Sequence, residues 1–296
     1  MSRYLVRSVE GNRQRLDGGA MFGNVPRPLW ELWIEPDERH RIPLACRAFL
    51  IEDQLQGHRI LLEAGIGVFF DPALRDRYGV AEPGHQLLAS LERIGVAPES
   101  IDTVVLSHLH FDHTGGLLTP WRADRPHEPV FPEARLLVSQ QAWERAHAPH
   151  LRDRASFAPE VLALLEQARS AGRLSLVAEQ GEAAALLGDG FCFHLSHGHT
   201  PGLLLTELAT ERGSVVFCGD LIPGRPWIHL PVTMGYDRYP ELLIDEKQRL
   251  LERCLERDTV LLLTHDAGCA ACRVERDRRG RFTATGAIEE LSALAL

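Results

Sequence analysis

One stretch of the chain concentrates metal-binding side chains: Ser107-His108-Leu109-His110-Phe111-Asp112-His113-Thr114-Gly115-Gly116. Three imidazoles and one carboxylate fall within positions 108–113. The preceding residues 103–106 are apolar and mostly β-branched, a pattern typical of a buried strand. The stretch therefore lies on a loop that leaves this strand. Neighbouring imidazoles gain little from solvent and much from a shared Zn²⁺-type ion, so the sequence predicts a metal site here.

The spacing within this stretch allows two ions. In a turn that leaves a strand, His108 and His110 can converge on one ion, while Asp112 and His113 can reach a second position nearby. Histidine-rich short tracts already favour metal binding. The alternative is a set of four unrelated polar side chains on a surface loop, which the clustering disfavours.

Length and composition indicate an ordinary globular protein. The 296 residues would fit two average domains or one α/β sandwich, and a hydrophobic content of 45% allows a sizeable core. We find no repeat of fixed period and no low-complexity linker, so a single domain over residues 1–296 is expected. A proline- and charge-rich run followed by helical candidates predicts a cap-like insertion around residues 119–173.

The charge balance narrows the expected partners. A net charge of −9 argues against a general nucleic-acid binder, because phosphate contacts need clustered Lys and Arg. The first residues carry charges where a secretion signal needs an apolar segment, and no stretch approaches the roughly 18 to 20 apolar residues that span a bilayer. We expect a cytoplasmic protein that acts on a small molecule and contacts neither nucleic acid nor membrane. Its oligomeric state is open, with a homodimer as one alternative.

Six cysteines are dispersed among apolar residues, as reduced core thiols of an intracellular enzyme would be. Cys269 and Cys272 form a Cys-x-x-Cys pair, which can bind zinc or do redox chemistry. A structural zinc needs a second pair, and a redox site needs its own helix start. Neither context is visible, so two unrelated free thiols are expected.

Strand-like and helix-like runs alternate along the chain, which indicates an α/β protein. A hairpin is expected from the apolar runs 45–52 and 58–63, and a glycine-rich loop at 17–26. The helix-like segments, identified by apolar spacing, are 84–94, 140–146, 159–171, 240–257 and 286–296.

Polar clusters also follow three strand-like runs in the second half of the chain. The cluster that contains His199 follows the run 191–195, and Asp220 follows the run 214–218. His265 follows the run 260–263. Loops at strand ends are where α/β proteins carry ligands and catalytic groups, so these residues are candidates to join the metal-binding stretch.

The combined pattern resembles the metallo-β-lactamase superfamily over most of the chain. It consists of His-x-His-x-Asp-His at 108–113, Gly-His-Thr-Pro-Gly at 198–202, Gly-Asp at 219–220 and a final His265. The resemblance implies a four-layered αβ/βα sandwich with metals at one edge between two sheets. Within the superfamily, three further stretches resemble the branch of N-acyl-homoserine lactonases, which are quorum-quenching enzymes, and methyl-parathion-type hydrolases: 17–23, 219–223 and 234–240.

The same resemblance implies a ligand set for two divalent ions. Zn²⁺ is expected first, with Mn²⁺, Fe²⁺ or Co²⁺ as alternatives, since imidazole and carboxylate suit several metals. One ion would be held by His108, His110 and His199, and the other by Asp112, His113 and His265, with Asp220 bridging both. Two such ions can share a hydroxide, the implied nucleophile on a lactone or another small ester-like bond. Asp112 is the implied proton shuttle to the leaving alkoxide.

The sequence departs from the family pattern where homoserine lactonases carry a tyrosine three residues after the bridging aspartate. This chain has Pro223 there. The missing hydrogen-bond donor would then come from Tyr236, Tyr239 or His229.

A second departure is Glu63, at a position where the family usually has an aspartate. A carboxylate there would orient a metal-bound imidazole, or it is an ordinary charged residue at a strand end. We also expect Met21, Phe22 and Trp227 to form the apolar wall of the substrate pocket.

Other functions stay open at this point. A phosphotriesterase or arylesterase of the methyl parathion hydrolase kind is the first alternative. A phosphodiesterase or nuclease is disfavoured by the acidic charge, and an oxygen-using mononuclear iron enzyme would not require Asp112 and His265. A non-catalytic metal-dependent binding module is the remaining alternative.

Overall fold

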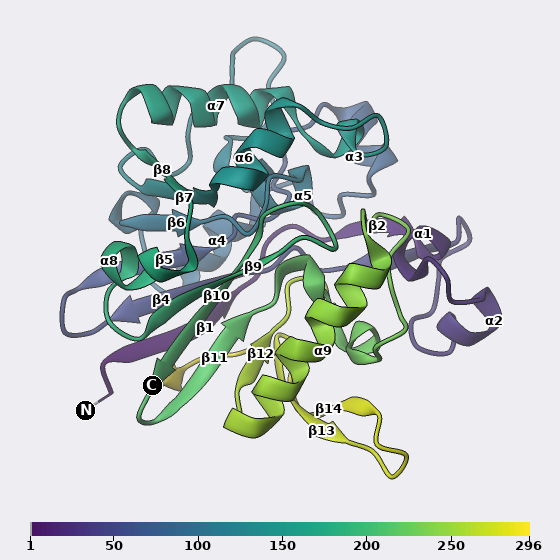
Figure 1. Cartoon of the computed structure of the whole chain (residues 1–296). Helices are drawn as coiled ribbons and strands as arrows, with labels where there is room; N and C mark the ends of the chain where they lie inside the picture. Colours follow the sequence, from purple (N-terminus) through teal and green to yellow (C-terminus); the bar gives the residue numbers. More distant parts are fainter. Residues whose placement is uncertain (1) are drawn as a thin grey trace.

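Two facing β-sheets form the centre of the molecule in the computed structural model, which describes residues 2–296 (Figure 1). The seven-stranded sheet has the order β15-β1-β4-β5-β6-β7-β8. In chain order its strands are β1 Tyr4–Val9, β4 Ala48–Asp53, β5 His58–Leu62, β6 Thr103–Val105, β7 Arg135–Ser139, β8 Leu174–Val177 and β15 Leu294–Ala295. Strands β5 to β8 are parallel to one another, whereas β15, β1, β4 and β5 pair antiparallel.

The second sheet has six strands in the order β14-β13-β12-β11-β10-β9. They are β9 Phe191–Ser196, β10 Leu203–Thr210, β11 Gly213–Phe217, β12 Val260–Leu262, β13 Ala271–Arg276 and β14 Phe282–Ile288. Only β11 and β12 pair in parallel. A small separate ribbon pairs β2 Gln14–Asp17 with β3 Arg41–Leu44.

Helices cover the outer face of each sheet, which gives four layers. The larger ones are α4 Gln86–Arg93, α6 Gln140–His147, α7 Pro159–Ser170 and α9 Pro240–Arg257. The shorter ones are α1 Gly18–Phe22, α2 Arg27–Trp30, α3 Pro72–Arg77, α5 Phe111–Thr114 and α8 Ala183–Leu187. Buried side chains of α4, α6 and α7 pack on the seven-stranded sheet, and those of α9 pack on the six-stranded sheet. The αβ/βα sandwich expected from the sequence is therefore confirmed.

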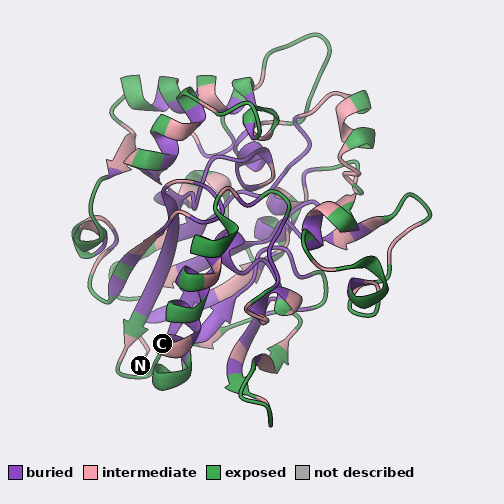
Figure 2. Ribbon diagram, turned by 45° about the vertical axis from the view of Figure 1, so that its right-hand side comes forward, coloured by how far each residue is buried: buried purple, intermediate pink, exposed green. Residues whose placement is uncertain are grey.

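The alternation of side chains along each strand explains why the sheets stack. In β4, Phe49 and Ile51 point into the core between the two sheets, while Leu50 points to the helices. In β11, Phe217 faces the same inter-sheet core and Val216 faces α9. Each fully buried side chain of this size contributes about 1.5–3 kcal/mol. Figure 2 shows the result as buried strands enclosed by helices whose outer faces are exposed.

Two expectations about local structure are wrong. Residues 286–296 were expected to form a helix, but they contain the end of β14 and all of β15. Pairing with β13 and β1 satisfies their backbone groups at two sheet edges, which outweighs weak local helix preference. Residues 17–26 were expected to be a loop, but they begin with α1, because the Asp17 carboxylate accepts a hydrogen bond from Ala20 N and caps the helix.

The single-domain organisation stays a prediction. Within the segment 119–173, strand β7 belongs to the seven-stranded sheet, so only the residues around that strand can cover a site. Ala155 and Ser156, in the connection between α6 and α7, line a pocket that also contains His110 and His199. All six cysteines are free, and Cys269 and Cys272 are both buried. Within residues 2–296, no helix is long and apolar enough to cross a membrane.

Glycines after the metal-binding stretch allow two backbone segments to touch. Gly116 N donates to Gly65 O at 2.9 Å, and a Cβ added to Gly116 would lie 2.0 Å from the carbonyl oxygen of Ala64. A Cβ on Gly115 would lie 2.2 Å from Ile66 O. This contact holds the end of β5 against the loop that follows β6.

We predict that Gly116→Ala lowers the free energy of unfolding by about 3 kcal/mol, since buried backbone must move to admit the methyl group. Urea-induced unfolding measures the change. Gly181→Ala is the matched control, because a Cβ there meets nothing within 4 Å, and its effect should stay within about 0.5 kcal/mol. Equal effects of the two substitutions would contradict the close-approach argument.

Candidate metal centre

The seven side chains singled out by the sequence come together at one edge of the sandwich. His108 and His110 lie on the loop after β6, and the short helix α5 carries Asp112 and His113. The six-stranded sheet supplies the other three from its strand ends: His199 from the β9–β10 connection, Asp220 from the turn after β11 and His265 from the loop after β12. Both sheets therefore contribute to the cluster.

The Asp220 carboxylate lies between the imidazoles. Its Oδ2 is 3.3 Å from His199 Nε2, and its Oδ1 is 3.2 Å from His265 Nε2. The same Oδ1 is 3.3 Å from His113 Nε2. Three overlapping groups have ligand atoms close enough to share an ion: His108, His110 and His199; His108, His113 and Asp220; and Asp112, His113 and His265.

These atoms fit divalent cations. Tetrahedral ligands about 2.0–2.1 Å from an ion lie roughly 3.3 Å from one another. His110 Nδ1 lies 3.3 Å from His199 Nε2, and His265 Nε2 lies 3.2 Å from His113 Nε2. Among the described residues, His108 Nε2 and Asp220 Oδ1 are buried without a hydrogen-bond partner. Since such atoms cost about 1–3 kcal/mol each when unsatisfied, the cluster is suited to cations rather than to packing alone.

Carboxylates on the far side orient two of the imidazoles. Glu63 Oε2 lies 2.9 Å from His113 Nδ1, and Asp237 Oδ1 lies 2.9 Å from His199 Nδ1. A carboxylate accepts a hydrogen bond from Nδ1–H, which leaves the Nε2 lone pair directed at the centre. Of the two interpretations of Glu63, the orienting one agrees with this contact. Glu63 also accepts a hydrogen bond from Ser107 N and adopts a left-handed backbone conformation, with φ of 71°.

Backbone and hydroxyl groups orient two further imidazoles. His265 Nδ1 lies 2.6 Å from the carbonyl oxygen of Ala45, so this nitrogen donates and its Nε2 is free to bind. His108 Nδ1 lies 3.0 Å from Ser107 Oγ. Ser107 belongs to the metal-binding stretch itself, whereas Ala45 lies on a segment to which the sequence assigned no role in the site.

The protonation equilibria reflect the clustering. Burial, followed by the charges of neighbouring imidazoles, lowers the pKa of His108 and of His110 well below the ordinary value. Burial opposes protonation of His113 and His265 too, but the carboxylates, Asp220 foremost, raise the pKa of both well above the ordinary value. Although burial favours its neutral form, the facing imidazoles lower the pKa of Asp220 well below its usual range. The carboxylates that favour protons on His113 and His265 also favour a divalent cation in place of those protons.

Two further residues hold the cluster and escaped the sequence analysis. Gln14 Nε2 donates to Asp112 Oδ2 at 2.7 Å. The buried guanidinium of Arg47 donates to Leu263 O at 2.9 Å and to Asp266 O at 3.1 Å, on either side of His265. Neither residue lies in a motif, and only the tertiary structure brings them to the site.

Helix α9 clamps two loops through adjacent side chains. The Glu246 carboxylate accepts hydrogen bonds from Ser196 Oγ at 2.6 Å and from Gly198 N at 3.0 Å, and so holds the loop of His199. Lys247 Nζ donates to Val232 O at 2.7 Å and to His229 O at 3.3 Å, and so holds the segment that leads to Asp237. Lys247 is the only lysine in the sequence, and it is fully buried.

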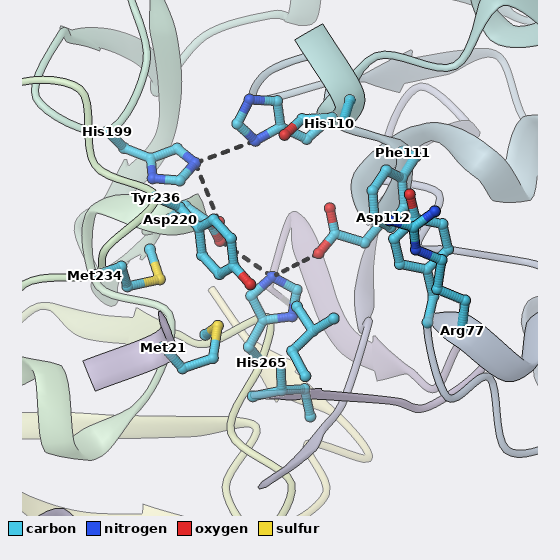
Figure 3. A pocket seen from close by; sticks show the side chains of 15 residues that line it. Met21, Arg77, His110, Phe111, Asp112, His199, Asp220, Met234, Tyr236 and His265 are labelled. Atoms are coloured by element: carbon cyan, nitrogen blue, oxygen red, sulfur yellow. Dashed lines mark hydrogen bonds and ion pairs between the residues drawn. The ribbon is translucent and has the colours of Figure 1, made fainter. Parts of the chain in front are cut away.

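A pocket of about 200 Å³ opens onto this cluster. Figure 3 shows its two sides: Met21, Met234 and Tyr236 lie across from Phe111, Asp112 and Arg77. Although Tyr236 is 40% exposed, partial desolvation together with the Asp112 charge raises the pKa of its hydroxyl to about 12, so the hydroxyl keeps its proton near neutral pH.

The residues expected in the substrate pocket divide into two sets. Met21 and Tyr236 line the pocket together with His110, Asp112, His199, Asp220 and His265 of the cluster. Phe22 and Trp227 do not; they are buried and stack with ring centroids 4.7 Å apart, and Trp227 Nε1 donates to Met21 O. They therefore support Met21 from behind.

The other two residues expected in the pocket lie outside it. His229 lines a separate surface groove beside Arg225 and Arg281. Tyr239 is exposed at the start of α9. Tyr236 is thus the one candidate among the three proposed donors that reaches the pocket.

Comparison with known proteins gives one family match. The model of the metallo-beta-lactamase superfamily matches residues 41–265. A probable metallo-hydrolase of Mycobacterium tuberculosis is 26% identical over 260 residues, covering 76% of this chain and 76% of that protein. A 7,8-dihydropterin-6-methyl-4-(beta-D-ribofuranosyl)-aminobenzene-5'-phosphate synthase of Methanocaldococcus jannaschii is 40% identical over 71 residues, and the chain spans only 23% of its length.

Solved structures share the fold over nearly the whole chain. A probable metal-dependent hydrolase from Staphylococcus aureus superposes with a TM-score of 0.83 at 25% identity, covering 97% of this chain and 99% of that one. AidC, a dizinc quorum-quenching lactonase, superposes with a TM-score of 0.74 at 18% identity, covering 96% and 95%.

The buried Lys247 predicts a specific pH dependence of stability. Burial lowers the pKa of Lys247 from 10.5 to about 7. Between pH 7 and pH 10.5, Lys247 binds a proton in the unfolded chain but not in the folded chain, so the free energy of unfolding rises with pH. Below pH 7, Lys247 is protonated in both states, and its contribution to the free energy of unfolding does not change with pH.

We expect Lys247→Met to remove up to roughly 1 kcal/mol per pH unit of this rise between pH 7 and 9, as measured by urea-induced unfolding at fixed metal concentration. The loss of two hydrogen bonds adds a constant offset that does not change the slope. Arg249→Met on the exposed side of the same helix is the control. Parallel pH profiles for wild type and Lys247→Met would contradict the argument.

Proposed function

The chain belongs to the metallo-β-lactamase superfamily and is a metal-dependent hydrolase, and from this premise we propose that it is a dinuclear enzyme that opens a lactone. One observation carries the proposal: the buried Asp220 carboxylate faces imidazoles on both of its oxygens, with separations of 3.2–3.3 Å. A single carboxylate shared in this way suits a bridge between two cations.

In the proposed centre, each ion has its own protein ligands and Asp220 is common to both. One ion would be held by His108, His110 and His199, and the other by Asp112, His113 and His265. When bound, such ions supply Lewis-acid polarisation of a carbonyl and lower the pKa of water to near neutrality. Zn²⁺ suits these ligands, as do Mn²⁺, Fe²⁺ and Co²⁺.

Side chains of the pocket would supply the proton transfer and the hydrogen bond to the substrate carbonyl. Gln14 holds Asp112 Oδ2, so the carboxylate keeps one orientation toward the pocket, where it can carry a proton to the leaving alkoxide. Tyr236 presents a protonated hydroxyl to the same space and is the proposed donor to the substrate carbonyl. Pro223 helps to hold the His265 backbone in place, since its carbonyl oxygen accepts a hydrogen bond from His265 N.

The apolar side of the pocket fits the acyl part of an ester-like substrate. Leu16, Leu44, Met21 and Met234 line it, and flexible thioethers adapt to chains of different shape. AidC, which shares the fold, is a lactonase, and this makes lactones the first substrate class to test. The absence of a basic cluster among the lining residues disfavours a nucleic-acid phosphodiester.

The decisive test combines metal analysis with a hydrolysis screen. Purified protein should contain more than about one metal per chain and should lose activity on chelation. Metal-loaded protein should hydrolyse short- and long-chain N-acyl-homoserine lactones faster than aryl phosphotriesters. Faster phosphotriester turnover would favour the phosphotriesterase alternative, and full activity after chelation would reject a metal-dependent reaction.

We predict that Tyr236→Phe lowers kcat/KM for a lactone by at least about tenfold, because the donor to the developing negative charge is lost. Metal content should not change, since Tyr236 is not in the ligand set. Tyr239→Phe removes a hydroxyl outside the pocket and serves as the matched control. A loss of activity that is the same in both variants would remove Tyr236 from the reaction.

A further inference from the structure

We propose that the substrate of this enzyme carries an anionic group, most simply a carboxylate, and that Arg77 binds it. This inference rests on the proposed hydrolase function, since the pocket concerned is the one that opens onto the metal centre. It adds a chemical requirement that a lactonase of neutral acyl chains would not have. Arg77 would thus determine specificity rather than take part in bond cleavage.

Arg77 stands apart from the arginines around it because it has no partner. Its neighbours are paired: Arg13 with Glu82, Arg15 with Asp37 and Arg39 with Asp76. Arg75, two residues earlier in α3, donates to a backbone carbonyl oxygen. Across residues 2–296, Arg77 has neither a carboxylate within 4.0 Å nor a hydrogen-bond acceptor.

The position of Arg77 makes its lack of a partner relevant to substrate binding. It lines the pocket on the side of Asp112 and Phe111, opposite Met21 and Met234 (Figure 3). The carboxylate of Asp112 makes no ion pair with Arg77, and Gln14 already donates to its Oδ2. Among the lining residues on this side, the Arg77 guanidinium is therefore the positively charged group that is available to a ligand anion.

The support beneath Arg77 is fixed in place. It is the last residue of α3, and the next residue, Tyr78, packs on Phe111 with ring centroids 4.4 Å apart and on Phe70 at 5.1 Å. The carbonyl oxygen of Tyr78 accepts a hydrogen bond from Arg15 N at 3.3 Å, on strand β2. The backbone of Arg77 is therefore held on both sides, while its side chain is exposed to solvent at the pocket and open to a ligand.

Desolvation decides which ligand suits this pocket. A neutral alkyl chain laid against Arg77 would remove water from the guanidinium and return no hydrogen bond, which is unfavourable. A carboxylate would accept two parallel N–H bonds from the planar guanidinium, the strongest common pairing for this side chain. The Met21 and Met234 side remains available for the apolar part of the same molecule.

The test uses pairs of substrates that differ only in charge. Homoserine lactones acylated with dicarboxylic acids of increasing length provide a free carboxylate at the chain end, and the matching carboxamides are neutral and of equal size. The corresponding lactams, which resist hydrolysis, are titrated calorimetrically into the protein as isolated with its metal. Wild type should prefer one carboxylate length over its carboxamide by about tenfold or more in kcat/KM, mostly through KM, and in lactam affinity.

The variants separate charge from shape. Arg77→Met keeps most of the stem and should abolish the preference, because it should lower kcat/KM for the carboxylates much more than kcat/KM for the carboxamides. Arg77→Lys should restore part of the preference, and Arg77→Glu should reverse it. Arg39→Met, an exposed arginine outside the pocket, is the control for general electrostatics and should behave as wild type.

The outcomes distinguish this proposal from the function on which it rests. If wild type hydrolyses the carboxamides as well as the carboxylates at every length, or if Arg77→Met slows both equally, the proposal is overturned and the lactonase function stands. If wild type hydrolyses neither, the proposed function fails. In that case the lactam titrations still decide the role of Arg77: a carboxylate preference that Arg77→Met removes supports it, and equal affinities reject it.

Discussion

A buried carboxylate surrounded by imidazoles is the interaction on which the rest of the structure depends. Asp220 lies within 3.3 Å of ring nitrogens from His113, His199 and His265, which come from both sheets. A buried negative charge is costly unless positive charge faces it closely. The strand ends that carry these residues must therefore be held at a fixed separation, and the apolar core between the sheets sets that separation.

The fold meets this requirement through layers of support behind each ligand. Glu63 and Asp237 accept from imidazole Nδ1 atoms, and the Ala45 carbonyl does the same for His265. Adjacent residues of α9 hold the loops from the other side. Because α9 is anchored by leucines buried against the six-stranded sheet, packing of an apolar helix face and placement of polar ligands are parts of one arrangement.

The pocket combines this rigid centre with two unlike sides. Thioether and leucine side chains line one side, whereas an acid, an aromatic ring and an unpaired arginine line the other. The chain replaces the tyrosine of homoserine lactonases with Pro223, and the backbone there supports His265 instead. Tyr236 reaches the pocket from a different loop, so a hydroxyl near the centre does not require that position in the sequence.

The metal-binding pattern, the class of fold and most of the strands could be predicted from the sequence, because they depend on local spacing. The residues from His108 to His113 occupy six consecutive positions. The apolar alternation that predicts strands depends only on neighbouring residues. Gln14, Arg47, Asp237 and Lys247 could not be assigned, since each acts on a partner distant in the chain. The last three strands, β13, β14 and β15, were not predicted, because pairing with other strands, not local preference, decides their conformation. The sequence alone thus determined which groups can bind metal. Only the tertiary structure decided which side chains orient those groups and which side chains line the pocket. The reason is that hydrogen bonds and burial act between residues that folding brings together.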